Sequence, residues 1–254
     1  MLADILPSNL FAFFLVFARV GSAVMLLPGF GESYVSTRIR LLFALTLAFA
    51  VTPVVQPHLP ELPSTVVRLF AILGGEIVVG LFIGSLASIA FMALNTAGSI
   101  VAYQSSLANA LVFDAAAAQQ GALVGAFLTT MGVVAVFVSD LHHVALRAVV
   151  DSYAVFPSGQ LPMIGDMADA IARVVSESFL IAVQFAAPIL VLGLVFYLGV
   201  GLLARLMPQV QIFFVVQPLQ IVLGLLVLLL TVGAGLAFFL DRFANVLTNF
   251  TGAS

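Results

Sequence analysis

Six long apolar runs constrain the fold of this chain more than any other sequence feature. A helix needs roughly 20 consecutive apolar residues to cross a hydrocarbon core about 30 Å thick, where open sheet edges are not tolerated. The runs lie at residues 10–27, 41–55, 69–94, 121–138, 179–203 and 212–240. They predict an all-α integral membrane protein with about six long helices, forming one membrane-embedded domain over residues 1–254.

Composition excludes several classes of function. Hydrophobic residues make up 63% of the chain and charged residues only 7%, whereas about a quarter of the residues in soluble domains are charged. The eight basic residues are all arginines, eleven acidic residues bring the net charge to −3, and cysteine is absent. We therefore expect no nucleic-acid partner, because no basic patch can neutralise phosphates, and no disulfide or thiolate metal site.

The polar stretch at residues 98–120 is the part of the chain least suited to lipid. Its polar side chains are Tyr103, Gln104, Ser105, Ser106, Asn109, Asp114, Gln119 and Gln120. Each unpaired polar group costs several kcal/mol in hydrocarbon, so such a stretch persists at membrane depth only inside protein or along a water-filled path. Polarity alone is equally compatible with a pore-lining or pore-plugging loop and with an ordinary connector outside the bilayer.

Charged and small residues within the apolar runs indicate helix contacts. Arg19 lies near the centre of the first run, where a charge costs about 2.5–3.5 kcal/mol, so we expect it to face protein, water or a partner subunit rather than to snorkel to an interface. Glu76 is a candidate ion or gate contact, but we favour pairing with an arginine on a neighbouring helix. Gly80 and Gly84 are spaced to let another helix approach closely.

Prolines, a polar connection and a histidine pair mark the later part of the chain. Pro188 and Pro218 interrupt the last two runs and predict kinked helices or hairpins. Residues 151–177 form the longest polar connection, and the helical spacing of its second half predicts an interfacial helix. His142 and His143 would point about 100° apart on a helix and would not readily share a metal ion, so we interpret them as an interfacial cap or subunit contact.

The arginines do not assign an orientation in the membrane. With six spans, three arginines fall on one side and four on the other, which is no positive-inside bias. Either the span list is wrong or the helices do not lie as independent bilayer crossings.

The most specific pattern lies between the last two apolar runs, at residues 204–219, which read ARLMPQVQIFFVVQPL. This pattern closely resembles the corresponding segment of the bacterial flagellar biosynthetic protein FliR family and of its virulence type III secretion counterparts. Further matches follow in order along the whole chain, at Pro28, Gly31, Arg38, Glu76, Gly80, Ala97, Gly98, Gln104, Phe113, Asp114, His142 and Pro157. Their order and spacing together are specific, although each is weak alone.

The resemblance implies a non-catalytic, pore-forming subunit of the flagellar type III protein-export gate. It also implies a single copy that joins several P- and Q-type subunits and other export-apparatus membrane proteins, and passes unfolded flagellar proteins across the bacterial inner membrane. In that family much of the nominally transmembrane part is raised to the periplasmic side of the flagellar basal body. Such an arrangement would account for the arginine distribution.

Roles for individual residues follow from the same resemblance. It implies a plug at residues 104–120, with Phe113 as its apolar stopper. The candidate plug residues are Gln104, Ser105, Ser106, Asn109, Phe113, Asp114, Gln119 and Gln120. The candidate subunit contacts are Arg19, Glu76, Gly80, Gly84, His142, Arg205, Met207, Pro208 and Gln209. The chain departs from the family where proline commonly follows the aspartate, because residues 115–118 are four alanines and favour helix.

Three alternatives to this function follow from the same observations. The first alternative is an export-gate subunit of a virulence type III secretion system, because the resemblance extends to that system. A secondary transporter for a small solute is supported by broken helices and buried charges. An intramembrane enzyme lacks support, because the spans contain no paired acids, HExxH motif or nucleophile–base spacing. We therefore predict no catalytic residue, no metal ligand and no cofactor.

Overall fold

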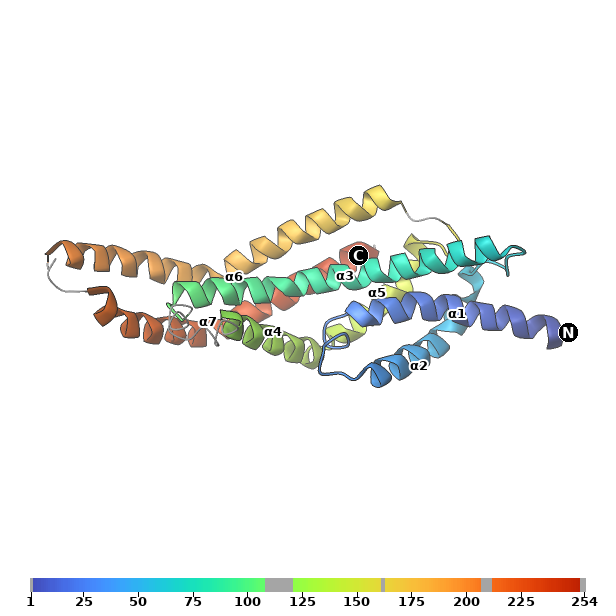
Figure 1. Cartoon of the computed structure of the whole chain (residues 1–254), viewed down its shortest axis with the longest axis horizontal. Helices are drawn as coiled ribbons and strands as arrows, with labels where there is room; N and C mark the ends of the chain where they lie inside the picture. The colour runs from blue at the N-terminus through green and yellow to red at the C-terminus, as the bar shows by residue number, and fades with distance from the viewer. Residues whose placement is uncertain (1, 108–120, 161–162, 207–211, 252–254) are drawn as a thin grey trace. The chain divides into compact units, whose positions relative to one another are not determined.

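The computed structural model describes residues 2–107, 121–160, 163–206 and 212–251, and these residues are almost entirely helical (Figure 1). The helices are α1 (Leu2–Leu26), α2 (Thr37–Val55), α3 (Val66–Gln104), α4 (Gly121–Val138), α5 (Leu141–Val155), α6 (Ile164–Leu206) and α7 (Ile212–Thr251), with a 3-10 turn at Gln56–His58. Five helices are long and apolar enough to cross a membrane, or six if the bent pair α4–α5 counts as one span. The predicted all-α membrane fold is therefore confirmed.

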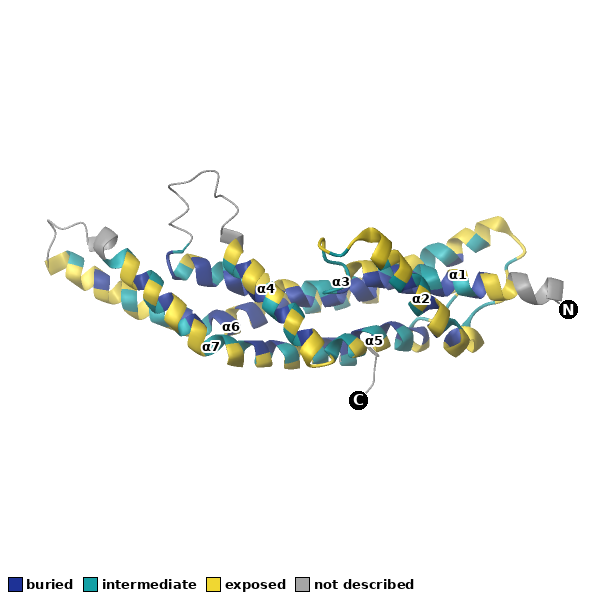
Figure 2. Ribbon diagram, turned by 90° about the horizontal axis from the view of Figure 1, so that it is seen from below, coloured by how far each residue is buried: buried dark blue, intermediate teal, exposed yellow. Residues whose placement is uncertain are grey.

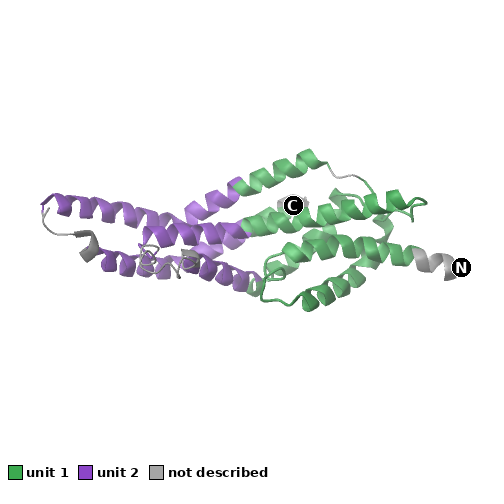
Figure 3. Ribbon diagram, viewed as in Figure 1, with its two compact units in different colours: residues 1–90, 137–175, 243–254 green, residues 91–136, 176–242 purple. Residues whose placement is uncertain are grey.

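The chain contains two compact units, which Figure 3 colours separately. The first consists of Met1–Ala90, Phe137–Val175 and Phe243–Ser254, and the second of Phe91–Val136 and Ser176–Arg242. Helices α3, α6 and α7 each contribute residues to both units. The sequence, with its unbroken succession of apolar runs, predicts a single domain and carries no signal for this division.

A tight turn joins α1 to α2 in the first unit. Gly29 adopts a left-handed φ of 81°, and the Gly31 amide donates to the carbonyl of Leu27 (2.8 Å). Arg40 donates from Nη2 to the carbonyl of Val35 (3.0 Å), so its guanidinium holds the turn against the start of α2. This turn is therefore made by glycine geometry and closed by an arginine.

Three helices are much longer than the apolar runs that predict them. Helix α3 contains 39 residues, α6 contains 43 and α7 contains 40. At 1.5 Å per residue, α3 alone measures about 58 Å along its axis, nearly twice the hydrocarbon core. These helices continue beyond their apolar runs into polar sequence. They can do so because the backbone hydrogen bonds of a helix form whether its side chains are polar or apolar. Much of the predicted connection 151–177 is accordingly helical, and only residues 156–163 lie between α5 and α6.

The helices differ in how much of their apolar surface the chain itself covers. In the best apolar window of α3, 61% of residues are buried, against 33% in α6 and 17% in α7. Figure 2 shows correspondingly long exposed faces on α6 and α7. Lipid or other protein must cover these faces, because large exposed apolar patches are not stable in water.

A sharp bend separates α4 from α5, whose axes differ in direction by 78°. Asp140, the residue before α5, adopts a left-handed φ of 59°, and its side chain makes no capping hydrogen bond. His142 lies one residue inside α5 and its ring stacks on that of Phe137, with the centroids 4.7 Å apart. The predicted end of the fourth run is confirmed, and the chain continues directly into another helix.

Candidate functional site

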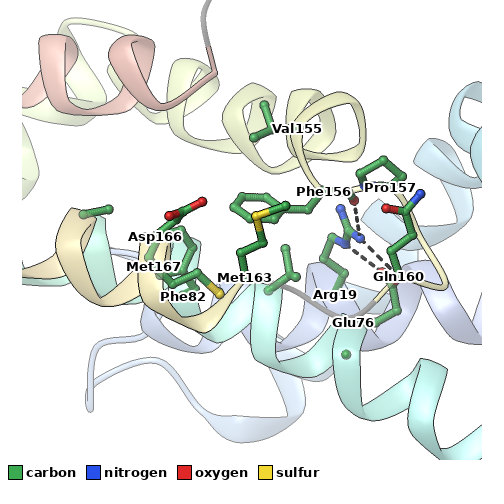
Figure 4. A pocket seen from close by; sticks show the side chains of 13 residues that line it. Arg19, Glu76, Phe82, Val155, Phe156, Pro157, Gln160, Met163, Asp166 and Met167 are labelled. Atoms are coloured by element: carbon green, nitrogen blue, oxygen red, sulfur yellow. Dashed lines mark hydrogen bonds and ion pairs between the residues drawn. The ribbon is translucent and has the colours of Figure 1, made fainter.

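A buried ion pair joins α1 to α3 in the first unit. Arg19 Nε donates to Glu76 Oε2 (2.6 Å), and Nη2 donates to Oε1 (3.1 Å), which makes the pair bidentate (Figure 4). The side chains of Arg19 and Glu76 are only 1% and 2% exposed. The interpretation that Glu76 pairs with an arginine of a neighbouring helix is confirmed.

Polar groups from α5 and the segment after it complete the surroundings of this pair. Arg19 also donates to Ser152 Oγ (3.2 Å) and to the carbonyl of Phe156 (3.0 Å). Ser158 Oγ donates to Glu76 Oε1 (2.6 Å), and the Tyr153 ring lies 3.9 Å below the guanidinium carbon. A buried ion pair is stable only when its remaining donors and acceptors are also satisfied. These contacts therefore lock α1, α3 and α5 together.

A cavity of about 400 Å³ lies beside the ion pair in the same unit (Figure 4). Its wall includes the apolar side chains of Phe82, Phe156 and Met163, and the polar side chains of Gln160 and Asp166. The guanidinium and carboxylate next to it are already paired with each other. The cavity therefore adjoins two charges that satisfy each other.

Close approach of α1 and α3 depends on the two glycines predicted to permit it. A Cβ atom at Gly80 would collide with the carbonyl oxygen of Arg19 and with Ser22 Oγ. A Cβ atom at Gly84 would lie 2.7 Å from the carbonyl oxygen of Ala23. Both glycines therefore let the backbones touch, as small residues do in membrane helix pairs.

The structure places four of the predicted subunit contacts between helices of this chain. Arg19 and Glu76 pair with each other, and Gly80 and Gly84 lie against α1. Their contact with partner subunits stays a prediction. The residue types identify close contacts, but they do not identify which helix supplies the other side.

The polar stretch begins in the second unit with a turn held by α6 and α7. Helix α3 ends at Gln104, and Ser105 and Ser106 are 1% and 3% exposed. Gln220 Nε2 donates to the Gln104 carbonyl (2.7 Å) and to Tyr197 Oη (3.0 Å), while Ser106 Oγ donates to Gln220 Oε1 (2.8 Å). We call this arrangement the α3 cap. It is a closed polar cluster among apolar helices.

Comparison with known proteins identifies the family. The model of the family described as "Bacterial export proteins, family 1" matches residues 10–246. The chain is 39% identical to the flagellar biosynthetic protein FliR of Caulobacter vibrioides over 93% of this chain and 94% of the relative. This chain belongs to the FliR family. It is therefore a membrane component of a type III export apparatus.

More distant relatives extend over most of the chain as well. The FliR of Bacillus subtilis is 30% identical over 86% of this chain and 85% of the relative. The Yop proteins translocation protein T of Yersinia pestis is 27% identical over 91% of this chain and 89% of the relative. The FliR resemblance inferred from the sequence motifs is thus confirmed.

Several predicted site residues of this FliR-family chain lie outside the described residues. They are Asn109, Phe113, Asp114, Gln119 and Gln120 of the plug and Met207, Pro208 and Gln209 of the subunit contacts. Arg205 is described, and it lies exposed in the last turn of α6. Among the described residues, no hydrogen bond or ion pair of its side chain is seen, and its contact with a partner subunit stays a prediction.

The histidine pair lies closer together than helix geometry predicts. The ring centroids of His142 and His143 are 4.0 Å apart. Together with Asp140 they offer three donor atoms within 4.8 Å of one another, the one such group in the described parts of the chain. Asp140 and His143 are 79% and 70% exposed, so both side chains can turn away into solvent. The proximity alone does not make a metal centre, and His142 remains a proposed subunit contact.

Sequence reasoning misses most residues that complete the two polar clusters. Gln220 and Tyr197 could have been identified from the sequence, because a polar side chain inside an apolar helix needs a hydrogen-bond partner. Ser152 and Ser158 could not, since serine is common at helix ends and in turns. Their roles depend on a fold that brings residues 19, 76 and 152 together.

Proposed function

We propose that this FliR-family chain is a non-catalytic, pore-forming subunit of the flagellar type III export gate. It assembles with P- and Q-type subunits and passes unfolded flagellar proteins across the inner membrane. The observation that carries the proposal is the family match over residues 10–246. The flagellar system is preferred to a virulence system because the Caulobacter relative, named a flagellar protein, is 39% identical and the Yersinia protein 27%.

Helix length and surface support an assembly partly outside the bilayer. Helices α3, α6 and α7 contain 39–43 residues, about twice what a bilayer core requires. The apolar windows of α6 and α7 are mostly uncovered by the chain itself. Partner subunits on the periplasmic side would cover surface that lipid does not reach, and this is why we propose that part of the chain is raised to that side.

Shortening the proposed plug tests the pore-forming role. Removing part of residues 107–119 should spare assembly and raise leakage, because plug residues stabilise a closed state without belonging to the packed wall. Phe113→Ala should give a milder leak, since it truncates only one apolar side chain. The measurement is ion or dye flux in cells that express the complete gate.

Matched variants distinguish the plug from a general defect. Phe127→Ala truncates an aromatic side chain that is 49% exposed on α4 and should leave flux unchanged. Co-purification of the P- and Q-type subunits shows whether the gate still forms. A fully assembled gate that stays tight after the shortening would reject the plug and favour a connector.

Arg205 tests the proposed contact with partner subunits. Arg205→Ala should weaken co-purification of the P- and Q-type subunits about tenfold, because a charge-assisted hydrogen bond is worth about 1.5–3 kcal/mol. Arg173→Ala is the matched control, since Arg173 is also exposed on α6 but lies in its polar first half. Equal recovery of partners with both variants would contradict the contact. Recovery of the wild-type chain alone or as a homo-oligomer would instead favour a solute transporter.

A further inference from the structure

The end of α3 is capped partly by the residues that follow it and partly by another helix. The last carbonyl groups of a helix have no partner within the helix, and a glycine in the left-handed conformation commonly closes such an end. Here the left-handed residue is Ser106, with φ 57°, which costs backbone energy that glycine would not. Ser105 donates to the carbonyl of Val101 from its amide (2.9 Å) and its hydroxyl (2.7 Å), and the Ser106 amide donates to the carbonyl of Tyr103 (3.3 Å). The carbonyl of Gln104 is instead bonded from outside α3.

Gln220 of α7 supplies what the helix end lacks. Its amide nitrogen donates to the Gln104 carbonyl and to Tyr197 Oη, and its amide oxygen accepts from Ser106 Oγ. Both donor hydrogens and one acceptor position of the amide are thus used, and the side chain is only 6% exposed. A buried amide with its groups satisfied in this way holds one orientation, because each alternative leaves a polar group unpaired.

Two glycines make room for the same turn. A Cβ atom at Gly224, one helical turn after Gln220, would lie 2.5 Å from Ser105 Cβ. A Cβ atom at Gly193, one turn before Tyr197, would collide with the side-chain amide of Gln104. Helices α6 and α7 therefore each offer a glycine beside a polar side chain. The glycines make room for Ser105 and Gln104, and the hydrogen bonds reach Gln104 and Ser106.

We infer that Gln220 is a positioning residue that holds the last turn of α3 on α6 and α7 and so fixes where the chain leaves α3. The Tyr197 hydroxyl accepts a hydrogen bond from the Gln220 amide nitrogen and so orients the amide. The Ser106 hydroxyl donates to the amide oxygen. The effect on leakage rests on the proposed function, because only a pore-forming chain would transmit a displaced α3 end to flux. The capping contact itself does not depend on that function.

Cysteine labelling in cells expressing the complete gate tests the inference. The chain has no cysteine, so Ser105→Cys introduces a unique thiol at a position that is 1% exposed. A membrane-permeant maleimide should label it slowly in the wild-type background. With Gln220→Met, a substitution of similar length and no hydrogen bonding, labelling should accelerate about tenfold or more, since at least one net buried hydrogen bond is lost.

Matched controls separate local release from unfolding. Gln184→Met, at an exposed glutamine of α6, should leave the labelling of Ser105→Cys unchanged. Ala186→Cys, fully buried in the same unit, should stay unreactive in the Gln220→Met background. Labelling at both buried positions would mean that Gln220 supports the unit generally, and would overturn a specific positioning role.

Partial variants and flux complete the test. Tyr197→Phe should accelerate labelling less than Gln220→Met does. The double variant should be labelled no faster than Gln220→Met alone, because both substitutions remove the hydrogen bond between Gln220 and Tyr197. Tyr103→Phe is its control, since Tyr103 is 72% exposed. Faster labelling without leakage supports the cap and rejects the pore-forming role. Unchanged labelling in Gln220→Met overturns the inference, whatever the flux.

Discussion

Glu76→Gln is expected to destabilise the first unit by about 3–5 kcal/mol, the cost of leaving one charge of a buried pair without its partner. The Arg19 guanidinium is 1% exposed and is held between α1, α3 and α5. Glutamine keeps the shape and one acceptor but not the charge. Thermal unfolding of the purified chain or gate should therefore move to a clearly lower temperature, and the amount of folded protein in the membrane should fall.

The double variant Arg19→Met with Glu76→Met should be less harmful than Glu76→Gln. Removing both charges leaves no buried ion, and apolar replacement of a buried pair is often neutral or stabilising. The exposed pair Arg147–Asp151, with N and O 3.6 Å apart, is the matched control. Asp151→Asn should change stability by less than about 1 kcal/mol, as is usual for surface pairs. A double variant as unstable as Glu76→Gln would indicate a role for the charges beyond mutual compensation.

Gly80→Leu is expected to separate α1 from α3 and to cost more than about 4 kcal/mol, at the exceptional end of single substitutions. Even a methyl group there collides with the α1 backbone, which cannot move aside like a flexible side chain. Gly80 also lies one helical turn after Glu76 on α3, so separation stretches the ion pair as well. Membrane insertion should persist, because leucine is more hydrophobic than glycine. The folded chain and its complex with partner subunits should be lost.

Gly74 provides the control on the same helix. No atom lies within 4 Å of a Cβ built at Gly74, so Gly74→Ala should be tolerated and should even favour the helix slightly. Gly80→Ala should already be destabilising. Motility and complex recovery at wild-type levels with Gly80→Leu would show that the close α1–α3 contact is not needed.

Local sequence properties predict the membrane helices and several of the close contacts. Run length and low charge predict the five or six apolar helices, because lipid excludes unpaired backbone groups and free charges. The intramembrane charges Arg19 and Glu76 require partners for the same reason, and Gly80 and Gly84 indicate close backbones. These inferences hold because each depends on the cost of one residue type in an apolar medium.

Tertiary structure alone decides which groups meet. Polarity predicts that Glu76 needs an arginine, but only the packing of α1 on α3 makes Arg19 that residue and keeps the contact within the chain. The length of α3 exceeds its apolar run because helical hydrogen bonding continues through polar side chains. Gln220 reaches Gln104 across 116 positions of sequence, and no local pattern encodes such a distance. Residue chemistry sets what each group requires, whereas long-range packing selects which neighbour meets the requirement.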